Sequence, residues 1–498
     1  MDLQHWNKSY IDGSWRDGNS QSLYQNINPF TQQPISEIRL ATAEDLDTAY
    51  QAAARVQKEW EQTSAYNWAA VMEKAAELMV ERAEELIEIL IAETGSTRIK
   101  ANIEAKSAFT MLKMAARNPF KMETTIHPSF VNGKENRVYR KPIGVIGIIS
   151  PFNFPFILSL RAVATSLSTG NGVVLKPDSQ TYISGGLFLA KLFEDAGLPK
   201  GLFNVITAEV EEIGDAFVEH PVPRLISFTG STHTGRHIAQ LCGKHLKKSH
   251  LELGGNNPFL VLEDANVHQA VQAAIFGKYL HQGQICMSIN RLLVHKNLYG
   301  EFVELFVNQV KNLKVGNPDD PDTFIGPMIN HRAAERIRPL IDKSVDAGAQ
   351  LALEGKIYDN FIEPFVLTDV TSEMEIVQNE IFGPVACLIP VESDEEALRI
   401  ANDTPYGLST SIFTSSIEQG VRLAQQIESG IVHINDQTVN DEPNIPFGGV
   451  KDSGYGRYGG EGTQRIYDHS MDFRPARTAS ISILIFKFGK EKTPPLCS

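Results

Sequence analysis

Short apolar runs rich in β-branched residues alternate with helical stretches along this chain, and that alternation constrains its fold more than any other feature. Four runs typical of buried strands follow one another: GVIGIIS (144–150), GVVLKP (172–177), LFNVIT (202–207) and RLISFTG (224–230). Helical patterns follow the last three of these runs, at 183–196, 209–219 and 234–243. Strands separated by helices in this way predict a parallel sheet with crossover helices.

A second alternating set follows the first. Its strand-like runs are at 258–262, 291–295, 386–391, 408–413 and 431–434, and its helical stretches are at 266–281, 299–313, 331–347, 394–402 and 417–428. Residues 44–117 form a helical block ahead of both sets, in which Gly95 suits the end of a helix, and short β-like pieces occupy 118–142. The sequence therefore predicts two closely packed α/β domains with no long linker between them.

Charge and cysteine usage exclude several classes of function. The 498 residues include 46 Lys plus Arg against 60 Asp plus Glu, a formal net charge of −14 that argues against nucleic acid or an anionic membrane as the main partner. No apolar run approaches the roughly 18 to 20 residues of a membrane span, and the N-terminus lacks the apolar stretch of a signal peptide. Four cysteines with no C-x-x-C pair predict neither a disulfide framework nor a metal site. We therefore expect a cytoplasmic protein.

A glycine turn is the first segment with chemical meaning. FTGSTHTG (228–235) places Gly230 and Gly235 between an apolar strand and a helix. Such glycines let the backbone approach a phosphate, and the helix N-terminus adds N–H donors. The spacing matches neither G-x-G-x-x-G nor the P-loop pattern, and a glycine turn before a helix is more often purely structural.

Cys286 lies in HQGQICMSINR (281–291), between a helical stretch and a strand-like run. A lone cysteine usually serves as a small buried apolar residue. The glycine and glutamines just before Cys286 indicate a turn that exposes the sulfur. A reactive thiol also needs an electropositive environment or a nearby base, because its ordinary pKa is about 8.5.

Four polar side chains stand at the ends of predicted elements: Asn153 in SPFNFPF, Lys176 in GVVLKP, Glu252 in LELGGNNP and Glu380 in NEIFGP. An acidic residue between leucines, such as Glu252, is rarely buried without a partner or a task. Each of the four also has a structural interpretation, as a salt-bridged strand end, a turn cap or a solvated charge.

Taken in order, these segments resemble the aldehyde dehydrogenase superfamily. The resemblance rests on FNFP, LKP, GSTHTG, LELGG, GQICMS, EIFGP and PFGGVKDSGYGR (446–457) and extends from about Tyr10 to about Ile466, more than nine-tenths of the chain. It implies a Rossmann-type dinucleotide-binding domain at 1–117 and 138–254, a catalytic domain at 255–450, and a small β element for oligomerisation at 118–137 and 466–490.

The resemblance also implies roles for individual residues. Cys286 would be the nucleophile and Glu252 the general base, while the Asn153 amide and the backbone N–H of Cys286 would bind the oxyanion. The resemblance also implies seven cofactor-binding residues. Gly230, Ser231 and Gly235 belong to the turn at the pyrophosphate. Lys176 and Ser179 would lie at the adenosine ribose, Glu380 at the nicotinamide ribose and Phe382 beside the nicotinamide ring. Because a water-activating Glu252 is present, hydrolysis to a free acid is favoured over transfer to coenzyme A.

The cofactor preference depends on the residues just after Lys176. Many NAD-preferring relatives carry a glutamate there, which repels a 2′-phosphate, and this chain has Asp178 followed by Ser179. We expect NAD as the cofactor, with NADP use compatible with the serine.

The segments SPFNFPFILSLRAVA (150–164) and LKPDSQT (175–181) resemble the benzaldehyde and vanillin dehydrogenase branch, and this favours an aromatic aldehyde. The residues expected to line an apolar pocket for a flat ring are Phe152, Phe154, Ile285, Met287 and Phe447. The same residues also suit core packing. The first arginine after Cys286 is Arg291, so the sequence shows no obvious clamp for a carboxylate-tailed substrate.

Two alternatives stay open: a semialdehyde dehydrogenase on the same scaffold, and a catalytically silent dinucleotide-binding relative. Intact Cys286, Glu252 and Asn153 argue against the second. Family members usually end in a strand that pairs across a dimer interface, and SISILIFKF is the segment of this chain that would supply it. We therefore expect a homodimer or homotetramer.

Overall fold

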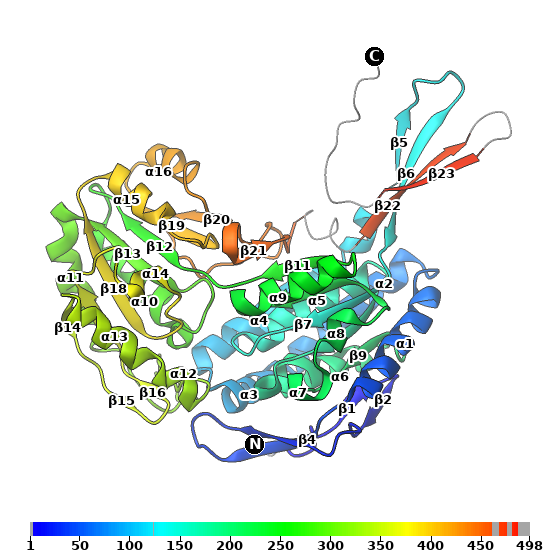
Figure 1. Cartoon of the computed structure of the whole chain (residues 1–498), viewed down its shortest axis with the longest axis horizontal. Coiled ribbons are helices and arrows are strands. Elements are labelled where there is room, and N and C mark those ends of the chain that lie inside the picture. The colour runs from blue at the N-terminus through cyan, green and yellow to red at the C-terminus, as the bar shows by residue number, and fades with distance from the viewer. Residues whose placement is uncertain (1–2, 123, 461–467, 476–480, 487–498) are drawn as a thin grey trace.

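The structure, a computed structural model, describes residues 3–122, 124–460, 468–475 and 481–486. Two α/β lobes stand side by side, and a four-stranded sheet projects from the first lobe as an arm (Figure 1). Each lobe has an open sheet with helices on its two faces, which confirms the α/β fold class expected from the alternation of strands and helices.

The first lobe is built on an eight-stranded sheet. Its strand order is β2 (Ser14–Arg16), β1 (Ser9–Ile11), β9 (Phe203–Val205), β8 (Gly172–Lys176), β7 (Val145–Ile149), β10 (Pro223–Thr229), β11 (Lys248–Glu252) and β21 (Gly454–Tyr455). The five strands between β1 and β21 are parallel, whereas β1, β2 and β21 pair antiparallel at the two edges.

Helices cover both faces of this sheet because successive strand residues point to opposite sides. Val174 of β8 faces a cluster with α1 (Ala43–Trp60) and α9 (Thr232–Lys244), whereas Val173 and Leu175 face the opposite cluster. That cluster contains α2 (Ala65–Glu81), α3 (Ala83–Thr94), α4 (Arg98–Ala115), α5 (Pro155–Ser168) and α6 (Phe188–Asp195). The helical block at 44–117 is thus four helices, and Gly95 (φ 66°) ends α3 as predicted.

The second lobe is built on a seven-stranded sheet. Its strand order is β14 (Gln350–Leu353), β17 (Phe365–Thr368), β18 (Val385–Val391), β13 (Ile289–His295), β12 (Asn257–Val261), β19 (Ser409–Phe413) and β20 (Ile431–Ile434). All of these pair parallel except β14. One face packs against α10 (Val267–Tyr279) and α11 (Lys296–Val310), and the other against α13 (Ile337–Asp346), α15 (Asp394–Asn402) and α16 (Ile417–Ala424).

Two of the predicted helices are each split in the structure. Residues 209–219 form α7 (Val210–Ile213) and α8 (Ala216–Glu219), because Gly214 between them has φ 51° and leaves the helical conformation. Residues 331–347 form α12 (His331–Glu335) and α13. The sequence pattern also missed β14 and β17, since strands of four residues show little alternation.

The arm is an antiparallel sheet made of segments far apart in sequence. Its strand order is β23 (Ile481–Phe486), β22 (Asp468–Pro475), β6 (Glu135–Pro142) and β5 (Thr125–Pro128). β6 continues through the domain boundary expected between residues 137 and 138, and 118–121 form the short 3-10 helix η1 (Asn118–Lys121) outside this sheet. Residues 123, 466–467, 476–480 and 487–490 of the expected element lie outside the described residues. Among the helices that the structure describes, none is long and apolar enough to cross a membrane.

Candidate active site

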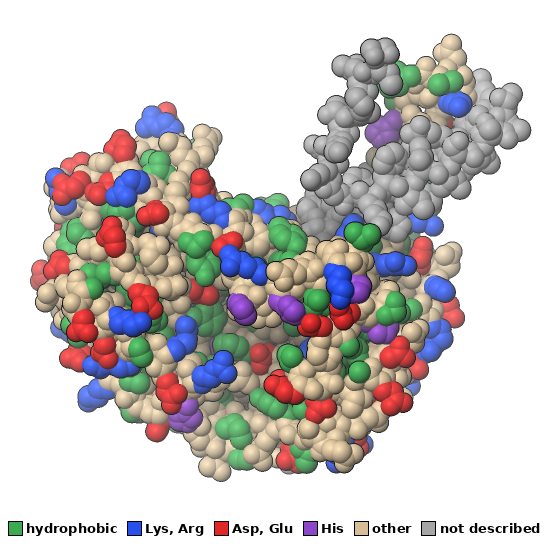
Figure 2. Space-filling model, viewed as in Figure 1, with side chains coloured by type: hydrophobic (Ala, Val, Ile, Leu, Met, Phe, Trp, Pro, Cys, Tyr) green, Lys and Arg blue, Asp and Glu red, His purple; other side chains and the backbone are tan. Residues whose placement is uncertain are grey.

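The carboxyl ends of the parallel strands in the first lobe meet at one edge of the sheet. Ile149 of β7 pairs with Lys176 of β8, and Thr229 of β10 pairs with Glu252 of β11. The strand order reverses between β7 and β10, and ligands of open α/β sheets bind outside the carboxyl ends at such a reversal. Figure 2 shows the surface hollowed between the two lobes, where this edge faces the second lobe.

Asn153 follows β7 directly, and two hydrogen bonds fix its side chain. Its Oδ1 accepts the backbone N–H of Phe154 (3.0 Å), and its Nδ2 donates to the carbonyl oxygen of Gln284 (3.0 Å). Since an amide nitrogen carries two hydrogens, the second is left for a substrate oxygen next to the loop that carries Cys286.

A buried ion pair supports the turn around Asn153. The Glu104 carboxylate accepts the backbone N–H groups of Phe156 (2.9 Å) and Ile157 (3.1 Å), so it caps the N-terminus of α5. Lys100 forms an ion pair with Glu104, both side chains are fully buried, and the Lys100 Nζ lies 4.2 Å from the ring centroid of Phe154.

Left-handed backbone places Cys286 beside the junction of the lobes. After α10, His281, Gln282 and Gly283 have φ values of 51°, 58° and 70°, two of them at non-glycine residues, which is costly unless the surroundings hold them. The Asn257 side chain donates to the carbonyl oxygen of Cys286 (2.8 Å), and a Cβ on Gly255 would lie only 2.3 Å from that oxygen.

Cys286 is partly exposed as a residue, as the turn before it predicts, although the surrounding protein removes most of the water around its sulfur. Burial of the sulfur, followed by the carboxylates of Glu380 and Glu252, raises its pKa to about 12, while Arg161 opposes this shift. The protein alone therefore keeps the thiol protonated at neutral pH, and a base must remove its proton before it reacts.

Glu252 is buried at the end of β11 with one oxygen bound and one free. Its Oε1 lies 3.3 Å from the Nε2 of His250, and its Oε2 has no hydrogen-bond partner among the described residues. Burial raises the pKa of Glu252 to about 8, although Arg161 and Arg457 pull it down. A carboxyl group with such a pKa can exchange protons near neutral pH.

The turn from β10 to α9 has the properties of an anion site. Gly230 and Ser231 are accessible, and the Ser231 hydroxyl caps α9 by accepting the N–H of Thr234 (3.2 Å). Gly235 is needed for packing, since a Cβ there would lie 2.3 Å from the side chain of Leu253. Helix α9 therefore lies directly on the strand that leads to the catalytic edge.

Lys176 ends β8, and Ser179 begins the short 3-10 helix η2 (Ser179–Thr181) that follows it. Burial lowers the pKa of Lys176, and the nearby Asp178 carboxylate counteracts this. The Ser179 hydroxyl is buried and has no hydrogen-bond partner among the described residues. The neighbouring Asp178 carboxylate accepts the backbone N–H of Gln180 (2.9 Å) instead.

The second lobe contributes Glu380 and Phe382 to the same edge. Glu380 Oε1 accepts the backbone N–H of Gly255 (3.2 Å), and burial raises the pKa of this carboxyl to about 7. Phe382 has φ 50°, and its ring stands edge-on to Phe152 with 6.0 Å between centroids. The first contact joins the second lobe to the segment between Glu252 and β12, and the second joins it to the segment after β7.

The five residues expected around the substrate are placed differently from one another. Phe154 and Ile285 are buried in a small apolar cluster with Leu158 and Leu280, against which Met287 packs. Phe447 is buried beneath the Arg161 guanidinium, whose Cζ lies 4.6 Å from its ring centroid. Phe152 and Met287 are partly exposed.

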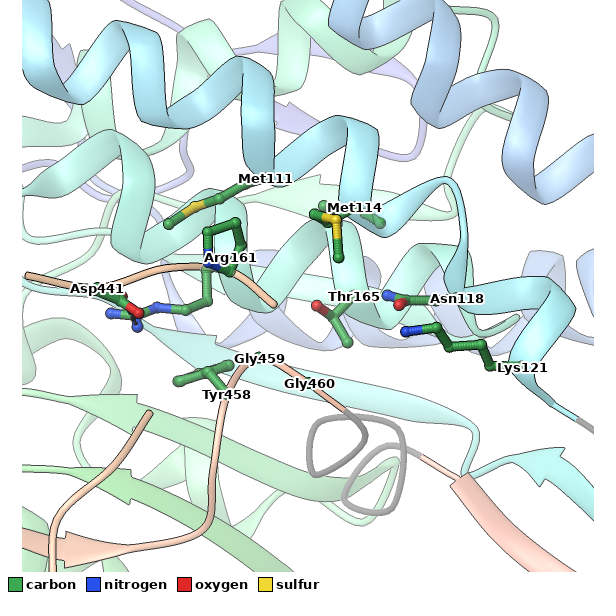
Figure 3. A pocket seen from close by; sticks show the side chains of 13 residues that line it. Met111, Met114, Asn118, Lys121, Arg161, Thr165, Asp441, Tyr458, Gly459 and Gly460 are labelled. Atoms are coloured by element: carbon green, nitrogen blue, oxygen red, sulfur yellow. Dashed lines mark hydrogen bonds and ion pairs between the residues drawn. The ribbon is translucent and has the colours of Figure 1, made fainter. Parts of the chain in front are cut away.

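A second hollow approaches the site from the side of α4 and α5. Its cavity of about 40 Å³ is lined by Met111 and Met114 of α4, Arg161 and Thr165 of α5, and the 441–460 segment (Figure 3). Arg161 donates to Asp441 (2.7 Å), and its Cζ lies 4.7 Å from the ring centroid of Tyr458. Tyr458, which lines this hollow, packs against His250, and His250 contacts Glu252, so the hollow lies close to Glu252. Arg161 also affects the pKa of Cys286 and of Glu252.

Comparison with known protein families shows to which family the chain belongs. A family model described as aldehyde dehydrogenase family matches residues 15–470. The chain belongs to that family. It is an aldehyde dehydrogenase, an enzyme that oxidises aldehydes with NAD or NADP, and the resemblance drawn from its motifs is confirmed.

The relatives of this aldehyde dehydrogenase cover nearly its full length. Benzaldehyde dehydrogenase YfmT of Bacillus subtilis (strain 168) is 50% identical over 455 residues, which are 91% of this chain and 94% of that protein. Vanillin dehydrogenase of Corynebacterium glutamicum is 46% identical over 456 residues, 91% and 94% of the two chains. The crystal structure of an NAD-dependent benzaldehyde dehydrogenase from Corynebacterium glutamicum has a TM-score of 0.88 at 42% identity, covering 95% of this chain and 97% of that one.

The groups at the edge of the first sheet fit a nicotinamide dinucleotide. The accessible N-terminus of α9 suits a pyrophosphate, and the unpaired Ser179 hydroxyl and the Glu380 carboxylate suit ribose hydroxyls. Gly254 lies between Glu380 and Thr232 at the start of α9, so these two parts of the proposed cofactor site are neighbours. The hollow beside Arg161 is lined instead by residues of α4, α5 and the 441–460 segment.

Sequence reasoning missed three residues that the fold brings to the site: Arg161, His250 and Tyr458. Arg161 lies mid-helix in α5, so only the tertiary structure shows that its charge affects Cys286. The arginine that follows Cys286, Arg291, is instead fully buried and donates to backbone carbonyl groups. The spacing of His250 and Glu252, two residues apart on a strand, was the available signal for that pair.

Proposed function

We propose that this aldehyde dehydrogenase oxidises aromatic aldehydes of the benzaldehyde and vanillin type to carboxylic acids, with NAD as its preferred cofactor. The observation that carries the proposal is that the Glu252 and Glu380 carboxylates, one from each lobe, lie close enough to Cys286 to raise the pKa of its thiol. In this reading the first lobe binds the dinucleotide, and the second lobe supplies the thiol.

The first step is attack of the Cys286 sulfur on the aldehyde carbon. Its proton must leave first, and the buried carboxylate of Glu252, with a pKa of about 8, is the base that the site offers. A C–S bond forms, and the carbonyl π electrons move to oxygen. The free N–H of Asn153 and the backbone N–H of Cys286 are the donors for that oxyanion, and one such donor typically lowers a barrier by about 3 kcal/mol.

The second step breaks the aldehyde C–H bond and restores the C=O bond as a thioester. When bound, the oxidised nicotinamide ring supplies the acceptor for the hydride that leaves the substrate carbon. Asn153 and Cys286 keep the acyl oxygen in place. Phe382 and Glu380 are the residues proposed to position the ring and its ribose, since both lie at the lobe junction.

The third step is hydrolysis of the thioester. After the proton taken from Cys286 has passed to solvent, Glu252 takes a proton from water, the oxygen of that water attacks the acyl carbon, and the C–S bond breaks to release the acid and the thiolate, which regains its proton from Glu252. The unpartnered Oε2 of Glu252 is the atom free to accept this proton.

Two features support an aromatic substrate over a carboxylate-tailed one. Both relatives named above for their substrate act on aromatic aldehydes, and the approach beside Arg161 is lined by two methionines and Tyr458. Arg161 is the one cation of that lining close to Cys286, and Asp441 already neutralises it. The carboxylate of a semialdehyde substrate would therefore have to compete with Asp441 for the Arg161 guanidinium.

Steady-state kinetics test this proposal. We expect the highest kcat/KM for benzaldehyde or vanillin, lower values for acetaldehyde and succinic semialdehyde, and a higher value with NAD than with NADP. Cys286→Ala should abolish oxidation yet retain NAD binding, whereas Cys242→Ala, which removes a buried thiol on α9, should retain activity. A panel in which succinic semialdehyde is the best substrate would overturn the substrate class.

We also propose a homo-oligomer formed through the arm and a cytoplasmic location. The arm exposes Ile126, Phe130 and Val131, and among the described residues β5 and β23 are the edge strands of its sheet. The nucleophile must remain a free thiol, which the reducing cytoplasm maintains.

A further inference from the structure

His250 is a buried histidine that the mechanism above does not use. It precedes Glu252 by two residues on β11, so the two side chains leave the strand on the same face. Its Nε2 lies 3.3 Å from Glu252 Oε1, and both side chains are buried.

The His250 ring is clamped on its other sides. The ring of Tyr458 packs against it with 4.0 Å between centroids, and the Tyr458 hydroxyl is hydrogen-bonded to Ser227 of β10. A Cβ on Gly456 would lie 2.3 Å from His250 Cδ2, so the backbone there presses on the ring edge. A ring held in this way cannot swing away from Glu252.

The Glu252 carboxylate is constrained from the opposite side. A Cβ on Gly448 would lie 2.8 Å from Glu252 Oε1, so any larger residue at position 448 would collide with that oxygen. With Oε1 set between Gly448 and His250, the unpartnered Oε2 is the oxygen left for water.

We infer that His250 is the positioning residue of the general base: its neutral ring donates the Nε2 hydrogen to Glu252 Oε1, stabilises the ionised carboxylate and directs Oε2 at the hydrolytic water. This inference rests on the proposed function. The donor form is required because an ionised carboxylate can only accept hydrogen bonds.

Charges around the pair favour this protonation pattern. Arg161 of α5 and Arg457 of the C-terminal segment face both residues, Asp441 lies beyond Arg161, and Cys286 faces Glu252 from the loop after α10. Burial and the two arginines lower the pKa of His250 to about 3, so the ring is neutral throughout the working range. Its N–H donation is then independent of pH, and only Glu252 titrates.

The test compares His250→Gln with His250→Asn, because a glutamine amide reaches the position of Nε2 and an asparagine amide does not. We expect the Asn variant to lower kcat by about tenfold or more, with KM values within about twofold, since a hydrogen bond to a charged group contributes about 1.5–3 kcal/mol. In this variant the midpoint of the rise of kcat with pH should move up by about one pH unit. The Gln variant should keep most of the wild-type kcat and the wild-type dependence of kcat on pH.

A cofactor-free assay isolates the hydrolytic step. With 4-nitrophenyl benzoate as the probe, all variants should release a burst of nitrophenol equal in amplitude to the active sites. In His250→Asn and His250→Ala the burst should form more slowly, because Glu252 also deprotonates Cys286, and the steady rate, which reports hydrolysis, should fall as well. The matched control is His220→Gln, because His220 also stacks on a tyrosine (Tyr50, 4.6 Å) and contacts a carboxylate (Asp47, 2.9 Å) away from the site. It should behave as the wild type.

The outcomes separate two failures. If kcat rises over the same pH range in the Gln and Asn variants, His250 only packs the interior. The same conclusion would follow if the burst were lost and KM rose while the pH dependence of kcat stayed unchanged. Absence of aldehyde oxidation and of a Cys286-dependent burst in the wild type would instead overturn the proposed function itself.

Discussion

At the scale of single residues, burial controls the reactivity of Glu252. Its carboxyl has a pKa of about 8 because burial outweighs the two neighbouring arginines. As the base must be ionised, kcat should rise with pH from 6 to about 8 and level off above that value. Stopped-flow measurement of acid release across this range checks the prediction, and a flat profile in the wild type would contradict it.

The same shift predicts a stability difference. A folded pKa above the ordinary carboxyl value means that the folded state binds the proton more tightly than the unfolded state, so the cost of Glu252 is absent below about pH 4.5 and complete above about pH 8. Glu252→Gln should therefore raise the melting temperature more at pH 8.5 than at pH 5. An equal increment at both values would mean that this carboxyl is not the group involved.

The sequence predicted the candidate catalytic residues better than their surroundings. Cys286, Glu252 and Asn153 stand in short motifs whose turn residues and strand ends already indicate exposed polar groups. Arg161 and Tyr458 carry no such local signal, because one lies within a helix and the other follows an irregular segment. Their approach to the site depends on how α5 and the C-terminal segment pack.

At the scale of elements, the buried Lys100–Glu104 pair holds the start of α5 in place. Glu104→Ala removes the cap of α5 and leaves the Lys100 charge buried without its partner, which typically costs about 3–5 kcal/mol. The double variant Lys100→Met/Glu104→Gln keeps the volume and removes both charges, so it should recover most of that loss. Chemical denaturation of the three proteins measures the difference; a double variant as unstable as Glu104→Ala would refute the pairing argument.

Long elements were predictable and short ones were not. The parallel strands of the first sheet and the helices that flank them follow from apolar runs and helical periodicity. The division of 209–219 depends on one left-handed glycine, and β14 and β17 have only four residues each. The arm joins segments more than 300 residues apart, such as β6 and β22, and no local pattern records that pairing.

At the scale of the whole molecule, the arm is the surface that predicts association. Phe130 is fully exposed, Ile126 and Val131 are more than half exposed, and all three lie on or between β5 and β6 (Figure 1). Isolated exposed side chains are ordinary, but three apolar residues gathered on a projecting sheet, at its edge strand β5 and the turn that follows, favour a second copy of the chain as the partner.

Charges placed on the arm should therefore separate the subunits. We expect Ile126→Asp/Phe130→Asp to shift the mass measured by light scattering toward the monomer, because a buried carboxylate in an apolar interface carries a large desolvation cost. The control is Ile417→Asp, since Ile417 is 57% exposed on α16 of the second lobe, away from the arm. The Ile417→Asp protein should keep the wild-type mass. If the arm variant also keeps that mass, association uses another face, whereas a monomer that retains full kcat for benzaldehyde would show that each subunit contains a complete site.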